Sequence, residues 1–143
     1  MRRVTRSALV THTANQMFDV VNDVNRYAEF LPWCVDSVVL EDVNNIMVAQ
    51  LVIARGGLKR SFTTKNTHHM PDRIQMELVK GPFSKLFGLW QFTQLGGDGC
   101  RIEMDLSFDF DNRMMNMTLA SVFNVAADTM VDAFCKRADE LYA

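Results

Sequence analysis

Few residues of this 143-residue chain have the types and spacing for metal or catalytic chemistry. His68 and His69 form an adjacent pair, and imidazoles are common zinc ligands. Neighbouring residues of a strand point to opposite faces of a sheet, so the pair cannot hold one metal ion together. His12 is isolated in the sequence. We therefore expect no metal site.

Carboxylates can perform acid–base catalysis when two of them share a site. Asp105, Asp109 and Asp111 share one face of a predicted strand, but it is the polar face, which favours a solvated row. The chain lacks glycine-rich nucleotide-binding motifs and the G-x-S-x-G turn of hydrolases. No nucleophile has a base beside it. We expect a non-enzymatic protein without catalytic residues or a required cofactor.

The three cysteines, Cys34, Cys100 and Cys135, are odd in number and widely spaced. This pattern is typical of reduced thiols in a reducing compartment. The charged start, Met1–Arg6, has no apolar stretch behind it, so no signal peptide is indicated. The apolar run Ile46–Ala54 is too short to span a bilayer. We expect a cytoplasmic protein, at most peripheral to the inner membrane.

The positive signal is apolar and aromatic, with ten Phe and ten Met in the chain. Such side chains suit a cavity for an apolar ligand, although Met fills gaps in solid cores equally well. A solid core is the simpler interpretation for any single residue. The predicted lining comprises Phe30, Phe62, Met76, Phe83, Phe87, Trp90, Phe92, Met104, Phe108, Leu119, Phe123 and Met130. Among these, Phe30, Phe83 and Trp90 would surround an entrance at the Pro32 and Gly81-Pro82 loops.

Positive charge gathers between Arg55 and Lys85, although the chain has a net charge of −2. Such a segment could face RNA or an anionic lipid surface. Solvated strand faces explain it slightly better, because no aromatic residues interleave as a stacking platform requires. The candidate contacts to RNA or to an anionic surface are Lys59, Arg60 and Lys65. We expect no contact with DNA.

The elements that would position these residues are clearest near the end of the chain. Cys100–Phe110 alternates apolar and polar residues without exception, which predicts a strand with one buried face. Asn112–Tyr142 has no Gly or Pro and predicts a helix of about 45 Å, around which the sheet should curve. Its expected apolar stripe is Leu119, Phe123, Ala126, Met130, Phe134 and Leu141. The small Ala126 and Ala133 could leave space under the helix or let the sheet approach closely.

The rest of the chain predicts one strand, two short helices and five more strands. Thr13 and Gln16 form a capping box for the first short helix, and Pro32 ends the second. Tight turns such as Gly56-Gly57 join the later strands, so neighbours pair antiparallel. These strands are Arg3–Val10, Val35–Leu40, Ile46–Ala54, Leu58–Lys65, Ile74–Leu78 and Phe83–Leu95. Helices on one face of an antiparallel sheet give an α+β fold, here as a single domain over residues 1–143.

Three segments carry a resemblance to a known family. Asn22–Cys34 reads NDVNRYAEFLPWC, and it resembles a motif of the coenzyme Q-binding family within the START-like, polyketide cyclase/dehydrase-like superfamily. Phe62–Asn66 and Leu78–Phe92 also resemble that family. The resemblance covers essentially the whole chain. It implies a helix-grip fold, in which a curved antiparallel sheet grips a long C-terminal helix with an apolar tunnel between them.

The resemblance implies two functions, which are compatible with each other. Eukaryotic members of the family bind ubiquinone and support respiration, so the first function is binding of ubiquinone or a related polyprenyl ligand in the tunnel. A bacterial branch is described as a ribosome-association toxin that binds the large ribosomal subunit and blocks subunit joining, which gives the second function. A third, weaker alternative is a cyclase or dehydratase, which would need a polar group inside the tunnel.

Overall fold

The computed structural model describes residues 1–55 and 57–142. Gly56, half of the predicted Gly56-Gly57 turn, lies outside the described residues, as do the side chains of Arg55, Met115, Asn116 and Thr118. The strands are β1 (Arg2–Val10), β2 (Cys34–Val43), β3 (Ile46–Arg55), β4 (Leu58–His69), β5 (Arg73–Lys80), β6 (Phe83–Leu95) and β7 (Gly99–Phe110). The helices are α1 (Ala14–Asn22), the 3-10 helix η1 (Val24–Arg26), α2 (Tyr27–Phe30) and α3 (Arg113–Tyr142).

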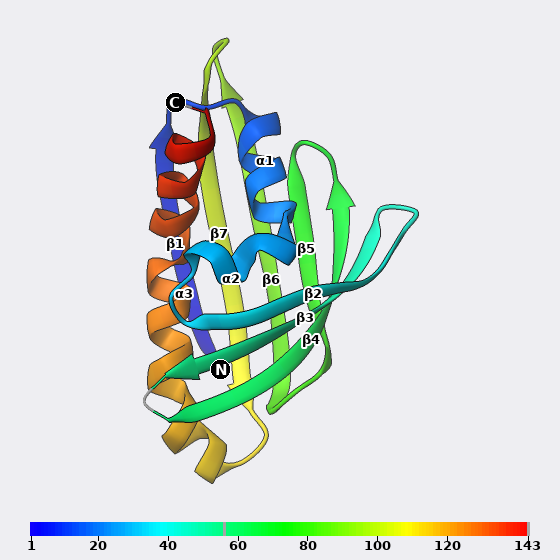
Figure 1. The fold of residues 1–143 in the computed structure, drawn as a ribbon, viewed down its shortest axis with the longest axis vertical. Coiled ribbons are helices and arrows are strands. Elements are labelled where there is room, and N and C mark those ends of the chain that lie inside the picture. Colours follow the sequence, from blue (N-terminus) through cyan, green and yellow to red (C-terminus); the bar gives the residue numbers. More distant parts are fainter. Residues whose placement is uncertain (56, 143) are drawn as a thin grey trace.

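All seven strands form one antiparallel sheet in the order β1-β7-β6-β5-β4-β3-β2. Consecutive strands from β2 to β7 are neighbours because their turns are too short for any other pairing. The sheet curves, and the helices lie on its concave side, with α3 running along β1 and β7 (Figure 1). The predicted α+β helix-grip fold is confirmed.

Helix α1 begins where the sequence predicts. The Thr13 hydroxyl accepts a hydrogen bond from the Gln16 backbone N–H, and the Gln16 side chain accepts one from the Thr13 N–H. This capping box satisfies two N–H groups that a helix start leaves without partners. Helix α2 is only one turn long and ends before Pro32. These two short helices and η1 cross the sheet face that α3 leaves open (Figure 1).

Strand β7 shows how the two faces of the sheet differ. Its alternate residues from Cys100 to Phe110 are buried toward α3, as the alternation predicts. The face of α3 that packs against them holds Leu119, Phe123 and Phe134, each at most 5% exposed. The stripe prediction was wrong at Leu141, which is 51% exposed, whereas Ala138 is fully buried. Ala138 follows Phe134 at the four-residue spacing of one helix face, whereas Leu141 lies in the last turn of α3, which ends at Tyr142.

The described cysteines are free thiols, with Cys34 and Cys100 buried and Cys135 half-buried. Burial raises the pKa of Cys34 and of Cys135 to about 11, so these sulfurs are protonated and unreactive near neutrality. Among the described residues, no helix combines the length and the apolar character needed to cross a bilayer.

Candidate functional site

A small apolar cavity lies between the inner face of the sheet and the middle of α3. Its volume is about 60 Å³, and one water takes up about 30 Å³ in the liquid. Pockets that hold drug-sized ligands measure about 300–1,000 Å³. The walls predicted to enclose a tunnel therefore stand only a short way apart at this place. Its lining comprises Val24, Tyr27, Trp33, Ala49, Leu51, Phe62, Thr64, Asn66, Met76, Leu86, Trp90, Met104, Leu106, Phe123, Ala126, Ala127 and Met130.

Half of the predicted lining residues meet at this cavity. They are Phe62, Met76, Trp90, Met104, Phe123 and Met130. Ala126 also lines it, so of the two alternatives for this small residue the structure shows space under the helix. Ala133 instead faces a surface hollow between α3 and the loop at Pro32.

An aromatic cluster closes the end of the space near the start of α3. Its members are Phe62, Phe83, Phe108, Phe110 and Phe123. The ring centroids of Phe108 and Phe123 are 4.6 Å apart, and those of Phe83 and Phe123 are 5.0 Å apart. Edge-to-face contacts at such distances fill volume efficiently. Phe83 and Phe108 are therefore packing residues of this cluster and do not line the cavity, and Leu119, which is 1% exposed, is likewise core.

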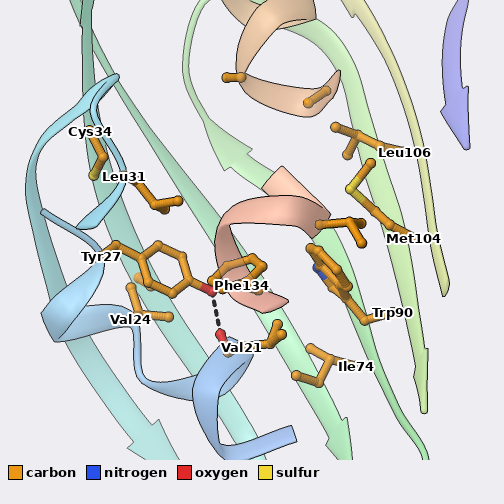
Figure 2. Close-up of a cluster of buried hydrophobic side chains, with 14 of the residues drawn as sticks. Val21, Val24, Tyr27, Leu31, Cys34, Ile74, Trp90, Met104, Leu106 and Phe134 are labelled. Atoms are coloured by element: carbon orange, nitrogen blue, oxygen red, sulfur yellow. Dashed lines mark hydrogen bonds between the residues drawn. The ribbon is translucent and has the colours of Figure 1, made fainter. Parts of the chain in front are cut away.

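Phe134 closes the other end. Its ring centroid is 5.3 Å from that of Tyr27 and 5.3 Å from that of Trp90. Figure 2 shows Phe134 between these two side chains, with the Tyr27 hydroxyl donating a hydrogen bond to the Val21 carbonyl. Phe92 packs against Phe18 in this half of the core, also away from the cavity. Trp90 is 2% and Phe83 is 4% exposed, so two of the residues predicted at an entrance are buried.

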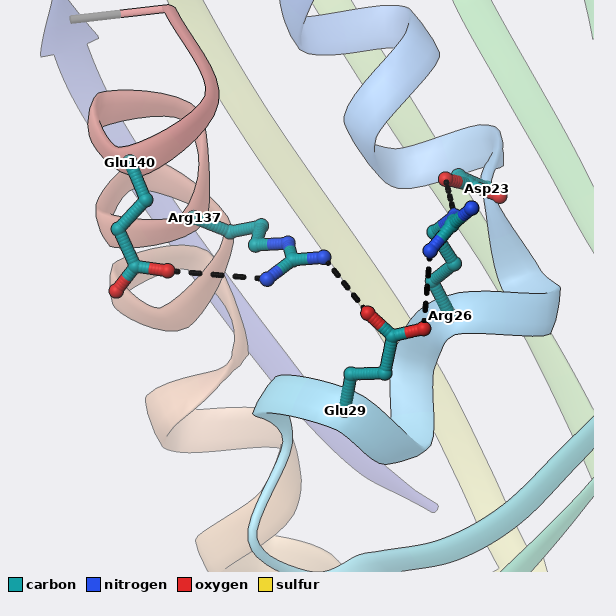
Figure 3. A network of polar contacts seen from close by, with 5 residues as sticks. All are labelled: Asp23, Arg26, Glu29, Arg137 and Glu140. Atoms are coloured by element: carbon teal, nitrogen blue, oxygen red, sulfur yellow. Dashed lines mark hydrogen bonds and ion pairs between the residues drawn. The ribbon is translucent and has the colours of Figure 1, made fainter.

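Phe30 is half-buried outside the cavity, under an ionic network that ties α2 to α3. The Arg137 guanidinium lies 5.0 Å from the Phe30 ring centroid and pairs with Glu29 at 3.0 Å. Glu29 also pairs with Arg26 at 3.1 Å, and Arg26 with Asp23 at 3.5 Å (Figure 3). The network links the one-turn helix α2 to α3 on the side of the core at which an entrance was predicted.

The prediction that Phe87 lines the cavity is wrong. It is 50% exposed, and it lies on the outer face of the sheet. A bulge between Phe83 and Lys85 shifts the alternation of β6, so Leu86, Gly88, Trp90 and Phe92 point inward and Phe87 points outward. The sequence shows an irregular start to this strand but not which residues it turns outward.

Several lining residues were missed although their strands carried the signal. Thr64 and Asn66 follow Phe62 at intervals of two on β4, so they share its face. Ala49 and Leu51 do the same on β3. The prediction counted mainly large aromatic and methionine side chains, so it passed over the polar Thr64 and Asn66 and the small Ala49, and it also missed Leu51.

The cavity contains polar groups but no side chain suited to acid–base catalysis. The Thr64 hydroxyl donates to Asn66 Oδ1 at 2.9 Å, and the Trp33 Nε1–H is buried without a hydrogen-bond partner. Burial raises the pKa of Tyr27, which keeps its hydroxyl neutral. Among the described lining residues none is a carboxylate, a histidine, a lysine or a cysteine. The polar groups can hydrogen-bond a bound molecule.

The two adjacent histidines point to opposite sides of β4, as strand geometry requires. His68 packs edge-on against Phe18 and pairs across the ladder with the buried Ile74, whereas His69 is exposed beside Arg73. Burial lowers the pKa of His68, so its ring is neutral at physiological pH. Within residues 1–55 and 57–142, no group of three or more His, Cys, Asp or Glu side chains has a geometry that could hold a metal ion.

The three predicted RNA contacts do not share one face. Lys59 and Arg60 are exposed at the start of β4, where they point to opposite sides. Lys65 lies further along on the outer face, and its ammonium is 3.6 Å from a Glu77 carboxylate oxygen. Lys59 and Lys65 therefore share the outer face of the sheet, and Arg60 points to the other side.

The fold and the apolar cavity define a helix-grip, START-like domain. Residues 10–135 match the family described as polyketide cyclase / dehydrase and lipid transport, so the chain belongs to that family. A Zhui aromatase/cyclase from Streptomyces sp. R1128 has the same fold, with a TM-score of 0.85 at 17% identity over 96% of this chain and 93% of its own. A START superfamily protein from Mycobacterium smegmatis gives 0.81 at 18% identity over 97% and 98%.

Two curated relatives carry functional names. A Pseudomonas aeruginosa protein named ribosome association toxin RatA is 49% identical over 97% of this chain and 96% of its own length. A Dictyostelium discoideum protein named coenzyme Q-binding protein COQ10, mitochondrial, is 30% identical over 92% of this chain and 66% of its own length. The predicted family is thereby confirmed.

Proposed function

We propose that this protein associates with the ribosome, binding the large subunit and blocking its joining to the small one. The observation that carries the proposal is the 49% identity, over nearly the whole of both chains, to a relative named ribosome association toxin. The described lining of the cavity, which has no acid–base group, is consistent with a non-enzymatic mode of action.

The size of the cavity also favours this function over quinone storage. A volume of about 60 Å³ is several times smaller than pockets that bury drug-sized ligands. A quinone ring with a polyprenyl tail would have to displace Phe123 or Phe134 from close ring contacts. A surface interaction requires no such rearrangement.

Sedimentation with purified ribosomal subunits tests the proposal. The protein should comigrate with large subunits, and adding it before the small subunits should reduce the fraction of joined ribosomes. Binding should weaken steeply with salt if phosphate contacts contribute. Comigration with neither subunit, at low salt, would contradict the proposal.

A charge-reversal pair sharpens this experiment. Lys59 is exposed at the start of β4, and Lys136 is exposed on α3. K59E should weaken subunit binding, whereas K136E changes the net charge equally and should leave binding unaltered. Equal effects of both variants would assign the binding to net charge alone.

A second function, binding of an apolar ligand, is supported by the cavity itself and by the similarity to the coenzyme Q-binding relative. Met76 and Met130 line the cavity and are only partly buried, so their flexible side chains could widen it for ubiquinone or another lipid. Mass spectrometry of organic extracts of the protein purified from its native host tests this. A stoichiometric lipid would support ligand binding, and its absence, together with no binding in ubiquinone titrations, would argue against it.

A further inference from the structure

A row of side chains crosses the outer face of the sheet, the face opposite the helices. Direct cross-strand pairs place Lys65 next to Glu77, Glu77 next to Phe87, Phe87 next to Ser107, and Ser107 next to Arg3. The row thus spans β4, β5, β6, β7 and β1 with a cation at each end. Phe87, at its centre, is 50% exposed.

A groove of about 650 Å³ runs along this row. Thr67, Gln75, Leu89 and Asp105 form the next row. They line the groove together with Arg3, Glu77, Phe87 and Ser107 of the first row, and Lys65 lies beyond its edge, next to Glu77. Ser107 is 8% exposed although it points outward, because it lies at the floor of the groove. The groove therefore offers one aromatic surface surrounded by hydroxyl, amide and carboxylate groups.

We propose that this outer groove binds an unpaired RNA nucleotide, with its base stacked on Phe87 and the adjoining phosphates directed to Lys65 and Arg3. The inference rests on the proposed ribosome association and identifies the surface and the RNA that it would use. Neighbouring strands are about 4.8 Å apart, so each cation lies about 10 Å from the strand of Phe87. That distance is comparable to the reach from a base to phosphates of its own strand.

The ion pairs in the groove leave donors and acceptors for an RNA base. Arg3 donates from Nε and Nη2 to the two Asp105 oxygens at 2.9 and 2.7 Å, which uses two of the five N–H groups of a guanidinium. Carboxylates such as Glu77 can accept hydrogen bonds from exocyclic amino groups of bases. An aromatic platform on an open sheet with polar groups around it is the arrangement by which proteins hold unstacked bases.

Substitution of Phe87 tests the proposal, because a half-exposed side chain can change without disturbing the core. The probe is a short labelled single-stranded RNA of mixed sequence, followed by fluorescence anisotropy. F87A should weaken binding about tenfold, as loss of one stacked base does. F87W keeps a stacking surface and should bind at least as well as the wild type. L40A removes an equally exposed apolar side chain, 55% exposed, from the distant edge strand β2 and should have no effect.

The same variants, tested on large ribosomal subunits and on protein-free ribosomal RNA, separate this inference from the proposed function. If the wild type binds subunits and F87A binds them equally well, the proposed function stands and the inference is overturned. If F87A weakens binding to subunits but the wild type does not bind free RNA, the groove holds a protein, which also overturns it. If the wild type fails to bind subunits, the proposed function fails, and the single-stranded RNA experiment still decides the inference.

Discussion

The inner and outer faces of one stretch of sheet, β6 with β7, use alternate residues of the same strands for opposite purposes. Inward, Trp90, Met104 and Leu106 are at most 3% exposed and line a cavity of about 60 Å³. Outward, Phe87, Leu89 and Asp105 border a groove about ten times larger. The larger hollow is therefore on the face without helices. Burial of aromatic rings against α3 stabilises the fold, and the open face is free to take a partner.

The strongest way to break this comparison is to truncate an aromatic residue on each face. Phe134 is fully buried between Tyr27 and Trp90, so F134A should lower the free energy of unfolding by about 3–5 kcal/mol. F87A should change it by about 0.5 kcal/mol or less, as surface substitutions do. Urea denaturation followed by circular dichroism measures both. Similar losses for the two variants would show that the outer aromatic also belongs to the core.

Substitution of a glycine next to the aromatic cluster should cause the next largest loss of stability. Gly81 has a φ of +156°, and a Cβ there would lie 2.7 Å from Phe62 Cβ. G81A should therefore lower the free energy of unfolding by about 3 kcal/mol through backbone strain and the displaced ring. Gly97 has no atom within 4 Å of such a Cβ, and G97A is the matched control, expected to be near neutral. If G81A were as stable as the wild type, the aromatic cluster could rearrange at little cost. That result would support a tunnel that opens at this end of the core.

Two alanines of α3 test whether the cavity is real space. Ala126 lines the cavity, whereas Ala138 is 0% exposed and lies outside its lining. A138V should cost about 2 kcal/mol by overpacking, and A126V, which adds methyl groups into the cavity, should cost less than about 1 kcal/mol. Thermal unfolding compares the two variants directly. An equal penalty would indicate that the inner face has no usable space.

The smallest expected effect is the pH-dependent stability contributed by the Arg3–Asp105 pair on the outer face. The hydrogen bonds from Arg3 hold the pKa of Asp105 below its ordinary value. A carboxylate with a lowered pKa stabilises the folded state above the ordinary pKa of Asp, and this contribution is lost as pH falls through the lowered value. R3A should thus be slightly less stable than the wild type at neutral pH and equal to it in acid. An NMR titration of Asp105 in the two proteins should show a higher pKa in R3A, and an unchanged pKa would refute the pairing.

Sequence periodicity by itself determined the elements and the fold class of this protein. The alternation in Cys100–Phe110, the uninterrupted helix that follows, and the tight turns left little freedom in how strands pair, because local spacing decides which side chains can be buried together. The capping box at Thr13 was equally local. The motifs around Asn22–Cys34 led to the right family for the same reason, since they lie in the sequence itself.

Only the tertiary structure decided how far the two walls stand apart and which residues face which surface. Cavity volume depends on contacts between residues distant in the chain, such as Phe108 with Phe123, and no spacing rule contains it. The bulge of β6 turned Phe87 from the predicted lining to the outer face, because one inserted residue reverses the alternation that follows. The outer row from Lys65 to Arg3 joins five strands, and it exists only through their register.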